Sequence, residues 1–554
     1  MLVRQSHEHK VVALPIAICW EKVIMRRYAS VKAIVLSLVL TAQITLLPSE
    51  VIGQSSGFGI TPIVRRGDPV SDGGRFFDCD LCEGRVVGFH ALNNKGDVAI
   101  GADTTGSCNE GRFLVSSGSS IRLADFCQQT PFGKLGILGS VNINQQSDAA
   151  MLVGVPVSNR VDAALLLRSN GQITKLVQEG DASPAGTIFK GCGFSAPSIN
   201  NRGEVAFSAC GETPQGFFRD GAFVYSGGQM RKVVLSGEPS PVGGEFVINF
   251  IPAPPVKIND NGEVLFLADV ILNSLTQKLG LWMATSNGFN KILFDDDPMP
   301  ASGLVMHKTF ANADLNNNGY VAFSVRLEGG NTDSGIFLYS NGQISKIMAE
   351  GDSSPIGGKF SSLLDPELRE DFPTPRMNGN GAVAFKVRVT GGNAPSAIFL
   401  ASPSAIVKVV AVGDQLPTGE TIRVIDTFAL NDLGQVAFFA YGKKDKTKPL
   451  GVYLATPPAP AIASIKLKSK KGSLQLRVNG NAMITNDTVI EINGVPLGAI
   501  DYPSDFREDG GTTTQLVSRD SRLEQLIPSG QTVQVMVYNS LTNLRSAPRM
   551  FTRD

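Results

Sequence analysis

One pattern of apolar and polar positions recurs along the chain. Each copy is an apolar residue followed by Asn-x-x-Gly-x-Val-Ala-Phe, and the clear copies begin at Asn200, Asn259, Asn316, Asn378 and Asn431. Two more degenerate copies begin at Asn93 and Asn144, and the second has Ser where the others have Gly. The leading asparagines lie 51 to 62 residues apart, a period that predicts one small β-sheet per repeat.

The motif has the composition of a tight turn between two strands. An Asn at the first position of a type I turn accepts backbone hydrogen bonds, and Gly at the fourth position adopts the positive φ that lets a hairpin restart. Val-Ala-Phe then begins the return strand. The segment Asp314–Gly319 superficially resembles a calcium loop, but its twelfth position is Val325 and not a bidentate Glu, so a turn is favoured.

The remainder of each repeat is clearest in the fifth copy. Ser334–Ser340 predicts a strand, Asn341-Gly342 a hairpin turn and Gln343–Ala349 another strand. The unit is therefore four antiparallel strands, with strand a before the Asn turn, strand b after it, and then strands c and d.

A Gly-Asp-x-x-Pro connector follows strand d, as at Gly351-Asp352. Asp295–Asp297 occupies the same slot in repeat four, so we interpret it as a degenerate turn and not as a metal site. Arg66-Gly67-Asp68 spells an adhesion tripeptide, which we interpret as a coincidence because Gly-Asp is the connector here.

The two ends of the repeat region complement each other. The last repeat lacks a strand d before the Pro-rich linker, while an unpaired strand d lies at Ile60–Arg66. We therefore predict an all-β seven-bladed β-propeller of four-stranded antiparallel blades over 54–456, closed by pairing of the N-terminal strand with Gly451–Leu454. An open stack of sheets is the alternative, and it leaves both edges unpaired.

The segment 457–554 alternates differently, with short strands such as Leu474–Gly480 and Val533–Asn539 separated by turn signals. This pattern predicts an immunoglobulin-like β-sandwich. Lys466, Lys468, Lys470 and Lys471 are interpreted as a solvated edge strand, with a cell-wall or polyanion contact as the alternative.

Two resemblances follow from these motifs. Residues 60–455 resemble bacterial extracytoplasmic proteins with tandem NxxGxxAF repeats, the "choice-of-anchor" repeat proteins, which implies an exported protein of undefined molecular role. The C-terminal order Val-Asn-Gly, Ile-Asn-Gly, Ile-Pro-x-Gly and Val-x-Val-x-Asn is similar to an IPT/TIG-type immunoglobulin-like domain.

The N-terminal 53 residues predict a leader. A basic segment starting at Met25 precedes an apolar run from Ala33 to Leu47, and small residues recur up to Gly53. This is the layout of a secretory signal peptide cleaved near Gly53, and the run is short for a membrane span. Residues 1–24 fit no part of a signal, which points to a true start at Met25. An uncleaved signal anchor is the alternative.

Six of the seven cysteines lie outside the leader, all between Cys79 and Cys210. In an exported chain this indicates disulfides, and zinc is disfavoured because only His90 and His307 remain. Cys192 and Cys210 lie eight residues before and seven after the turn Asn200–Gly203, so we expect them to pair.

The same reasoning applies to repeat one, where Cys82 and Cys108 lie at nearly equal distances from the turn. Cys79 and Cys127 then pair by elimination. The alternative pairs Cys79 with Cys108 and Cys82 with Cys127. Every one of these cysteines is expected on the face of the d–a and b–c connections.

The chain offers little catalytic chemistry. It has no Gly-x-Ser-x-Gly, phosphate loop or His-Glu-x-x-His motif, so we assign no catalytic, cofactor or metal residues. Lys and Arg total 50 and Asp and Glu total 50, a balance unlike the basic footprint of nucleic-acid binders.

We therefore expect a non-catalytic binding or surface scaffold, monomeric, with no membrane span in the mature chain. Its ligand, an unidentified protein or glycan, would bind the long b–c and d–a loops, such as 351–374 and 387–396. The alternative is a propeller lyase or glycosidase acting on polysaccharide. Ionisable residues converging at a channel mouth would favour that enzyme, and a flat mouth without them would favour the scaffold.

Overall fold

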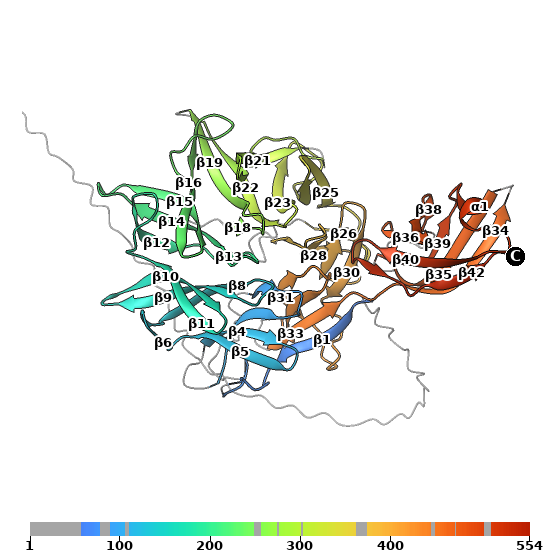
Figure 1. Cartoon of the computed structure of the whole chain (residues 1–554), viewed down its shortest axis with the longest axis horizontal. Helices are drawn as coiled ribbons and strands as arrows, with labels where there is room; N and C mark the ends of the chain where they lie inside the picture. The colour runs from blue at the N-terminus through green and yellow to red at the C-terminus, as the bar shows by residue number, and fades with distance from the viewer. Residues whose placement is uncertain are drawn as a thin grey trace, which may run out of the picture. The chain divides into compact units, whose positions relative to one another are not determined.

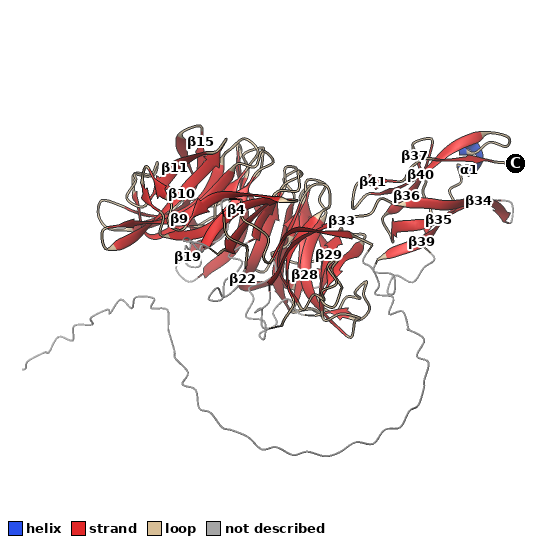
Figure 2. Cartoon of the chain, turned by 90° about the horizontal axis from the view of Figure 1, so that it is seen from below, coloured by secondary structure: helices blue, strands red, loops and turns tan. Residues whose placement is uncertain are grey.

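The computed structural model describes residues 57–71, 73–77, 89–105, 110–248, 256–273, 276–300, 303–361, 374–444, 449–470, 473–502 and 511–554. Within these ranges the chain is almost entirely strand and turn (Figure 2), and its one helix is the four-residue α1 (Leu523–Leu526). The predicted leader, including the cleavage position at Gly53, lies outside the described residues. No described helix has the length and apolar character needed to cross a membrane.

Each of the seven repeats forms one antiparallel sheet in the strand order a-b-c-d. In repeat five these strands are β22 (Leu304–Leu315), β23 (Val321–Glu328), β24 (Ser334–Ser340) and β25 (Gln343–Ala349). The bounds of β24 and β25 are those predicted from the sequence. Figure 1 shows the sheets following one another in chain order by colour.

The other repeats are built in the same way. Repeat one contains β2 (Phe89–Leu92), β3 (Val98–Asp103), β4 (Glu110–Ser116) and β5 (Ser119–Asp125). A hairpin of β6 (Gln129–Thr130) and β7 (Gly133–Lys134) separates it from repeat two, which contains β8 (Ile137–Ile143), β9 (Ala149–Val157), β10 (Arg160–Ser169) and β11 (Gln172–Gln178).

Three repeats have a strand a that is divided into two pieces. Repeat three contains β12 (Ile188–Phe194), β13 (Ser198–Ile199), β14 (Val205–Glu212), β15 (Phe218–Ser226) and β16 (Gln229–Leu235). Repeat four contains β17 (Glu245–Val247), β18 (Lys257–Ile258), β19 (Val264–Asn273), β20 (Thr276–Thr285) and β21 (Gly288–Phe294). Repeat six contains β26 (Lys359–Phe360), β27 (Arg376–Met377), β28 (Val383–Thr390), β29 (Ser396–Ala401) and β30 (Ile406–Ala411).

Repeat seven takes its fourth strand from the other end of the repeat region. β31 (Val424–Leu430), β32 (Val436–Tyr441) and β33 (Pro449–Thr456) are joined by β1 (Gly59–Arg65). β1 runs antiparallel to β33, from the pair Gly59 and Thr456 to the pair Arg65 and Gly451. The predicted pairing of these two segments is confirmed.

The seven turns have the geometry that the motif predicts. In repeat four the side-chain Oδ1 of Asn259 accepts hydrogen bonds from the backbone N–H groups of Asn261 (3.1 Å) and Glu263 (3.0 Å). Gly262 has φ of 79°, and Ser147, which replaces this glycine in repeat two, has φ of 71°. Repeat two therefore forms its sheet despite the departure, with the serine in a left-handed conformation that disfavours most side chains.

The turns are also bonded to one another, which the motif alone did not indicate. The Nδ2 of each leading asparagine from repeats two to seven donates to the backbone oxygen of the leading asparagine in the next repeat, at 2.9 to 3.4 Å. Repeat seven donates in this way to repeat one, and repeat one continues to repeat two through Asn93 Nδ2 and Ser147 Oγ (3.0 Å). The hydrogen bonds thus form a closed circuit through all seven repeats.

The apolar side chains follow the same circuit. In repeats three, five, six and seven the Phe of Val-Ala-Phe stacks on an aromatic residue of strand c, as Phe323 does on Phe337 at 5.9 Å between ring centroids. The other face of each sheet packs on the next repeat, and seven separate clusters lie between consecutive sheets. One of them joins repeat seven to repeat one, with Phe439 and Val452 against Val98 and Ile100.

The C-terminal segment forms two further antiparallel sheets. The first has the order β34 (Ala461–Lys470), β35 (Ser473–Ile484), β39 (Thr512–Ser518) and β38 (Ile500–Asp501). The second has the order β37 (Val495–Pro496), β36 (Thr488–Ile492), β40 (Thr532–Asn539) and β41 (Leu544–Arg545), with β42 (Arg549–Thr552) also on β40.

Both C-terminal sheets contribute to one apolar core, with Leu476 and Leu516 from the first and Ile490 and Val535 from the second. β34 lies at an edge, and its described lysines Lys466 and Lys468 are exposed. This matches the expected solvated edge strand.

Candidate functional site

The residue two places before each leading asparagine contributes to a single cavity. This cavity of about 160 Å³, here called the strand-a cavity, draws on strand a of every repeat. The seven equivalent residues that line it are Ala91, Asn142, Ser198, Lys257, Asp314, Arg376 and Ala429. Since strand a of each repeat runs toward its Asn turn, the circuit of turns brings these positions together.

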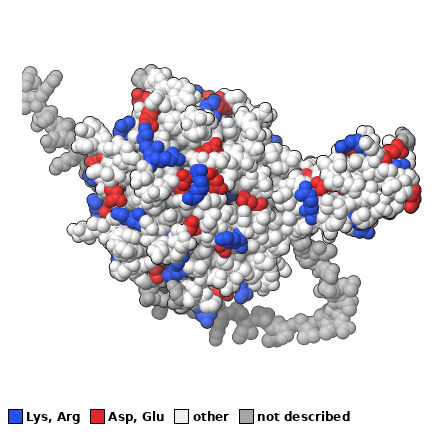
Figure 3. Space-filling view, in the orientation of Figure 1, with Lys and Arg blue, Asp and Glu red and all other residues white. Residues whose placement is uncertain are grey.

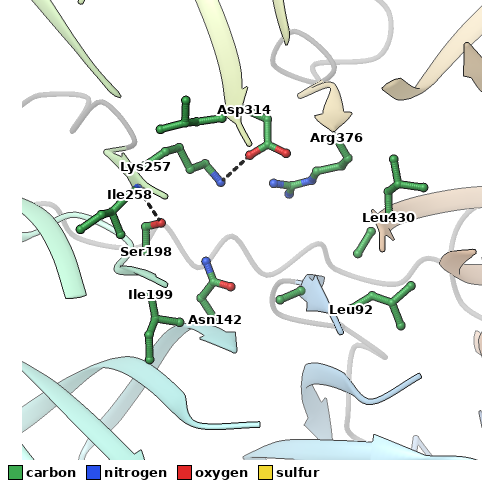
Figure 4. Close-up of a pocket in the computed structure, with 12 residues that line it drawn as sticks. Leu92, Asn142, Ser198, Ile199, Lys257, Ile258, Asp314, Arg376 and Leu430 are labelled. Carbon is green, nitrogen blue, oxygen red and sulfur yellow. Dashed lines mark hydrogen bonds and ion pairs between the residues drawn. The ribbon is translucent and has the colours of Figure 1, made fainter. Parts of the chain in front are cut away.

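One wall of the strand-a cavity is charged. Lys257 Nζ lies 3.5 Å from Asp314 Oδ1, and these side chains are 17% and 16% exposed. The other carboxylate oxygen of Asp314 accepts from the backbone N–H of Met377 at 2.9 Å. Figure 4 shows the Arg376 guanidinium pointing into the same space, beside this ion pair.

Burial lowers the pKa of Lys257, since the charged ammonium loses water. Asp314 opposes this effect and Arg376 adds to it, and the pKa of Lys257 lies below its ordinary value. Arg376 has no hydrogen-bond or ion-pair partner within the described part of the chain. The charged wall therefore carries one carboxylate and two cations.

The opposite wall is apolar. Ala91 and Leu92 of repeat one and Ala429 and Leu430 of repeat seven line it. Between the walls lie Asn142, whose amide faces the cavity in Figure 4, and Ser198, whose Oγ accepts from the N–H of Ile258 at 3.2 Å. The cavity therefore has a cationic side, an apolar side and neutral hydrogen-bonding groups between them.

A second candidate surface lies at the b–c connections. Here Phe217 and Phe218 of repeat three are 71% and 60% exposed, values that decide against a role in the core. Val161 in strand c of repeat two and Ile271 in strand b of repeat four are also exposed, each beside the b–c connection of its repeat. In repeat two the expected long loop is instead a prolonged hairpin, because β9 and β10 continue to a tight turn with Ser158 at φ 55°.

The disulfide predicted in repeat three is present beside these phenylalanines. Cys192 and Cys210 are bonded, with their Cα atoms 5.9 Å apart. Both lie within strands, β12 and β14, and not in the connections where we expected them. The strand register shifts between Phe189 and Phe194, so the ladder is irregular at the disulfide. The nearly equal distances of the two cysteines from the turn nevertheless predicted the pair correctly.

The other cysteines are only partly described. Cys127 is disulfide-bonded, to a partner outside the described residues. Cys79, Cys82 and Cys108 themselves lie outside the described residues, so both pairing schemes remain predictions.

The acidic connectors have a structural role. Asp352 Oδ2 accepts from the N–H of Ala349 at 2.9 Å, and the same carboxylate pairs with Lys346. In repeat four Asp297 pairs with Lys291 in the same way, and Asp296 takes the glycine's place at φ 68°. The interpretation of Asp295–Asp297 as a degenerate connector is confirmed.

The first connector behaves similarly, since Asp68 Oδ2 accepts from the N–H of Arg65 at 2.7 Å. The carboxylate of the Arg66-Gly67-Asp68 tripeptide is thus engaged within the fold. Cys192, Cys210 and Asp220 place sulfur and oxygen atoms within 4.8 Å, but the two sulfurs are bonded to each other. Basic and acidic side chains are interspersed over the face shown in Figure 3.

The sequence reasoning missed the strand-a cavity. The sequence does contain a signal for it. The residue two places before each leading Asn varies among Ala, Asn, Ser, Lys, Asp and Arg, while the motif beside it is nearly constant. Variation at one fixed place in a repeat indicates that the residue there is not needed for the turn and strand that all the repeats share.

Comparison with known sequences gives one family. The model of a family of unknown function, DUF7453, matches residues 40–329, 149–458 and 337–495 in overlapping segments. The chain belongs to the DUF7453 family. No curated protein matches this DUF7453 chain in sequence.

Solved structures resemble the DUF7453 chain only remotely. The β-propeller domain of the Trilobed protease from Pyrococcus furiosus has 10% identity and a TM-score of 0.33, over 62% of this chain and 91% of that one. The polysaccharide lyase Uly1 has 10% identity and a TM-score of 0.32, over 71% and 99%. Pyrococcus horikoshii acylaminoacyl peptidase has 11% identity and a TM-score of 0.32, over 65% of this chain and 51% of its own. None of these similarities carries an activity to this chain.

Proposed function

We propose that this DUF7453 protein is an exported, non-catalytic binding scaffold. The seven sheets are the blades of a closed β-propeller, β1 completes the seventh blade, and an IPT/TIG-like immunoglobulin-like domain follows over 457–554. The ligand is a glycan or protein bound by the b–c and d–a connections.

The exposed pair Phe217 and Phe218 carries this proposal. Large apolar side chains in water are costly, and aromatic residues on a polar surface are typical of binding sites. The ring of Phe218 lies against Gly191, where an added Cβ would come within 3.1 Å of it. The neighbouring Cys192–Cys210 bond fixes this segment, so the aromatic pair is presented on a stiff base.

Export is supported by the same bond. Disulfides persist in oxidising compartments and are rare in the cytosol, which agrees with the predicted signal peptide over the first 53 residues.

Binding of the purified chain to an array of glycans and peptidoglycan fragments tests the proposal. We expect the double variant Phe217→Ser, Phe218→Ser to lose at least ten-fold in affinity for the array component that binds wild type. Leu433→Ser is the matched control, because Leu433 is 51% exposed on an Asn turn, at the opposite end of the strands. Equal loss in both variants, or no binding by wild type, contradicts the proposed glycan-binding face.

A propeller lyase or glycosidase is the second candidate, favoured by the convergence of Lys257, Asp314 and Arg376 in the strand-a cavity. It ranks below the scaffold because Asp314 is already bonded to Lys257 and to the Met377 N–H. Release of new reducing ends or unsaturated products from uronate-containing polysaccharides by wild type, abolished in Asp314→Asn, would establish it. Wild type without turnover on these substrates would exclude the lyase.

A further inference from the structure

We propose that the strand-a cavity binds a small organic carboxylate, held at its anionic end by Arg376 and Lys257. The apolar part of this ligand lies against repeats one and seven. This site is separate from the proposed ligand face at the b–c and d–a connections.

The first argument is charge. Asp314 neutralises Lys257 across 3.5 Å, which leaves the positive charge of Arg376 unmatched among the described residues. Arg376 is half-buried in strand β27, where water screens its charge poorly. A carboxylate completes the set with two cations and two anions. Guanidinium groups bind carboxylates through two parallel hydrogen bonds, a geometry that adds selectivity over a spherical anion.

The second argument is the hydrogen-bonding edge. The only described partner of the Asn142 amide nitrogen is the oxygen of Pro197, at the long distance of 3.5 Å, so this N–H₂ can donate to a ligand oxygen. The hydroxyl of Ser198 accepts from Ile258 and keeps its own proton to donate. Both groups lie between the charged and apolar walls, beside the place where the carboxylate would sit.

The third argument is size and shape. Repeats seven and one carry alanine at the position that is Lys, Asp or Arg in repeats four to six, so space opens on that side. The cavity volume of about 160 Å³ is smaller than the roughly 300–1,000 Å³ of pockets that hold drug-sized ligands. The cavity therefore suits a small aliphatic acid, whose apolar chain faces Ala91 and Ala429.

Calorimetric titration of the full chain with acetate, butyrate and butyramide, in low-chloride buffer at pH 7, tests the proposal. We expect butyrate to bind more tightly than acetate, and butyramide at least ten-fold more weakly than butyrate. The comparison of acid with amide needs no variant, so it stands even if a cavity substitution prevents folding. Equal affinity for butyrate and butyramide, or no binding of either, overturns the proposal.

Variants place the ligand. Arg376→Gln should weaken butyrate at least ten-fold. The matched control Arg423→Gln, at an exposed arginine outside the cavity lining, should leave binding unchanged. Ala91→Leu should weaken butyrate more than acetate, because it fills the apolar side. The proposed site is overturned if Arg423→Gln and Arg376→Gln weaken butyrate binding equally. It is also overturned if the Arg376→Gln variant folds as wild type does and binds butyrate with unchanged affinity.

Discussion

Asn259 shows how much one side chain can do in this fold. Its oxygen accepts two backbone N–H groups within its own turn, and its nitrogen donates to Glu263 at 2.6 Å and to the backbone oxygen of Asn316 at 3.0 Å. Only an amide has both an acceptor and two donors in this geometry. The asparagine is therefore required twice, once for the turn and once for the link to the next repeat.

Asn259→Ala should destabilise the protein by about 3 kcal/mol, because it leaves buried backbone groups without partners. The measurement is the urea dependence of tryptophan or far-UV signals. Asn287→Ala is the control, since Asn287 lies exposed in a c–d turn and only its backbone is bonded there. If the two variants unfold at the same urea concentration, the link between turns contributes nothing.

Asp97 provides a pH-dependent contribution at the same scale. Burial alone would raise its pKa, but hydrogen bonds from Ser116, Ser147 and Asn93 outweigh it. With the added charge of Lys95, the pKa of Asp97 lies below its ordinary value of 3.8. The bond from Ser147 Oγ, at 2.7 Å, crosses from repeat two to repeat one.

A lowered pKa means that the folded state binds the proton less readily than the unfolded state. The stabilisation by Asp97 is then complete well above pH 3.8 and is lost as the pH falls below it. We expect Asp97→Asn to be less stable than wild type at pH 6, with a difference that narrows at pH 3. The exposed Asp333→Asn serves as the reference, and a constant difference at both pH values would contradict the expectation.

At the scale of elements, the disulfide joins two strands where the ladder is irregular. Cys192 lies between Gly191 and Gly193, both with positive φ, and its bond to Cys210 ties this irregular backbone to β14. The bond closes a segment of 18 residues, for which the chain-entropy model gives about 3 kcal/mol at most.

The double variant Cys192→Ser, Cys210→Ser should loosen residues 188–194 and 213–218 while the sheets remain folded. Hydrogen exchange resolved by peptide is the measurement. The β9–β10 hairpin occupies the equivalent place in repeat two without a cysteine and should keep its protection. Loss of protection in that hairpin or throughout β19–β25 would mean that the bond holds the whole repeat array and not one loop.

Strands, turns and the disulfide could be predicted from the sequence where they depend on residues close together in the chain. The bounds of β24 and β25, the turn glycines and the cysteine pair all follow from short-range patterns or from spacing around a turn. The strand-a cavity could not be predicted in the same way. Lys257, Asp314 and Arg376 come from three repeats, and only the contacts between turns bring their side chains together. The division of strand a into two pieces in three repeats also left no clear sequence signal.

For the whole molecule, β1 matters because it completes the sheet of repeat seven from the other end of the repeat region. Ile63 and Val64 of β1 are buried against repeat seven and repeat one. Deleting Gly59–Arg65 should cost roughly 3 to 6 kcal/mol from these two side chains and expose the outer edge of β33. Exposed edges pair with other chains, so we expect concentration-dependent association by light scattering.

A peptide with the sequence Gly57–Arg66, added in trans, should reverse this association and restore part of the stability. A peptide with the same residues in reverse order is the control. A deleted chain that does not associate and that unfolds at the wild-type urea concentration would show that the sheet of repeat seven does not need β1.

The pairing of β1 with β33 also sets an order of events during biosynthesis. Residues 93 and 431, which meet where the circuit closes, are 338 positions apart. A ribosome makes β1 before the other described strands and β33 last among the repeats. β1 therefore stays unpaired, with its backbone groups bonded to water, until 456 of the 554 residues have been made. The first of the described strands to be made is thus among the last to be assembled, and every chain released before β33 is made lacks the strand that β1 requires.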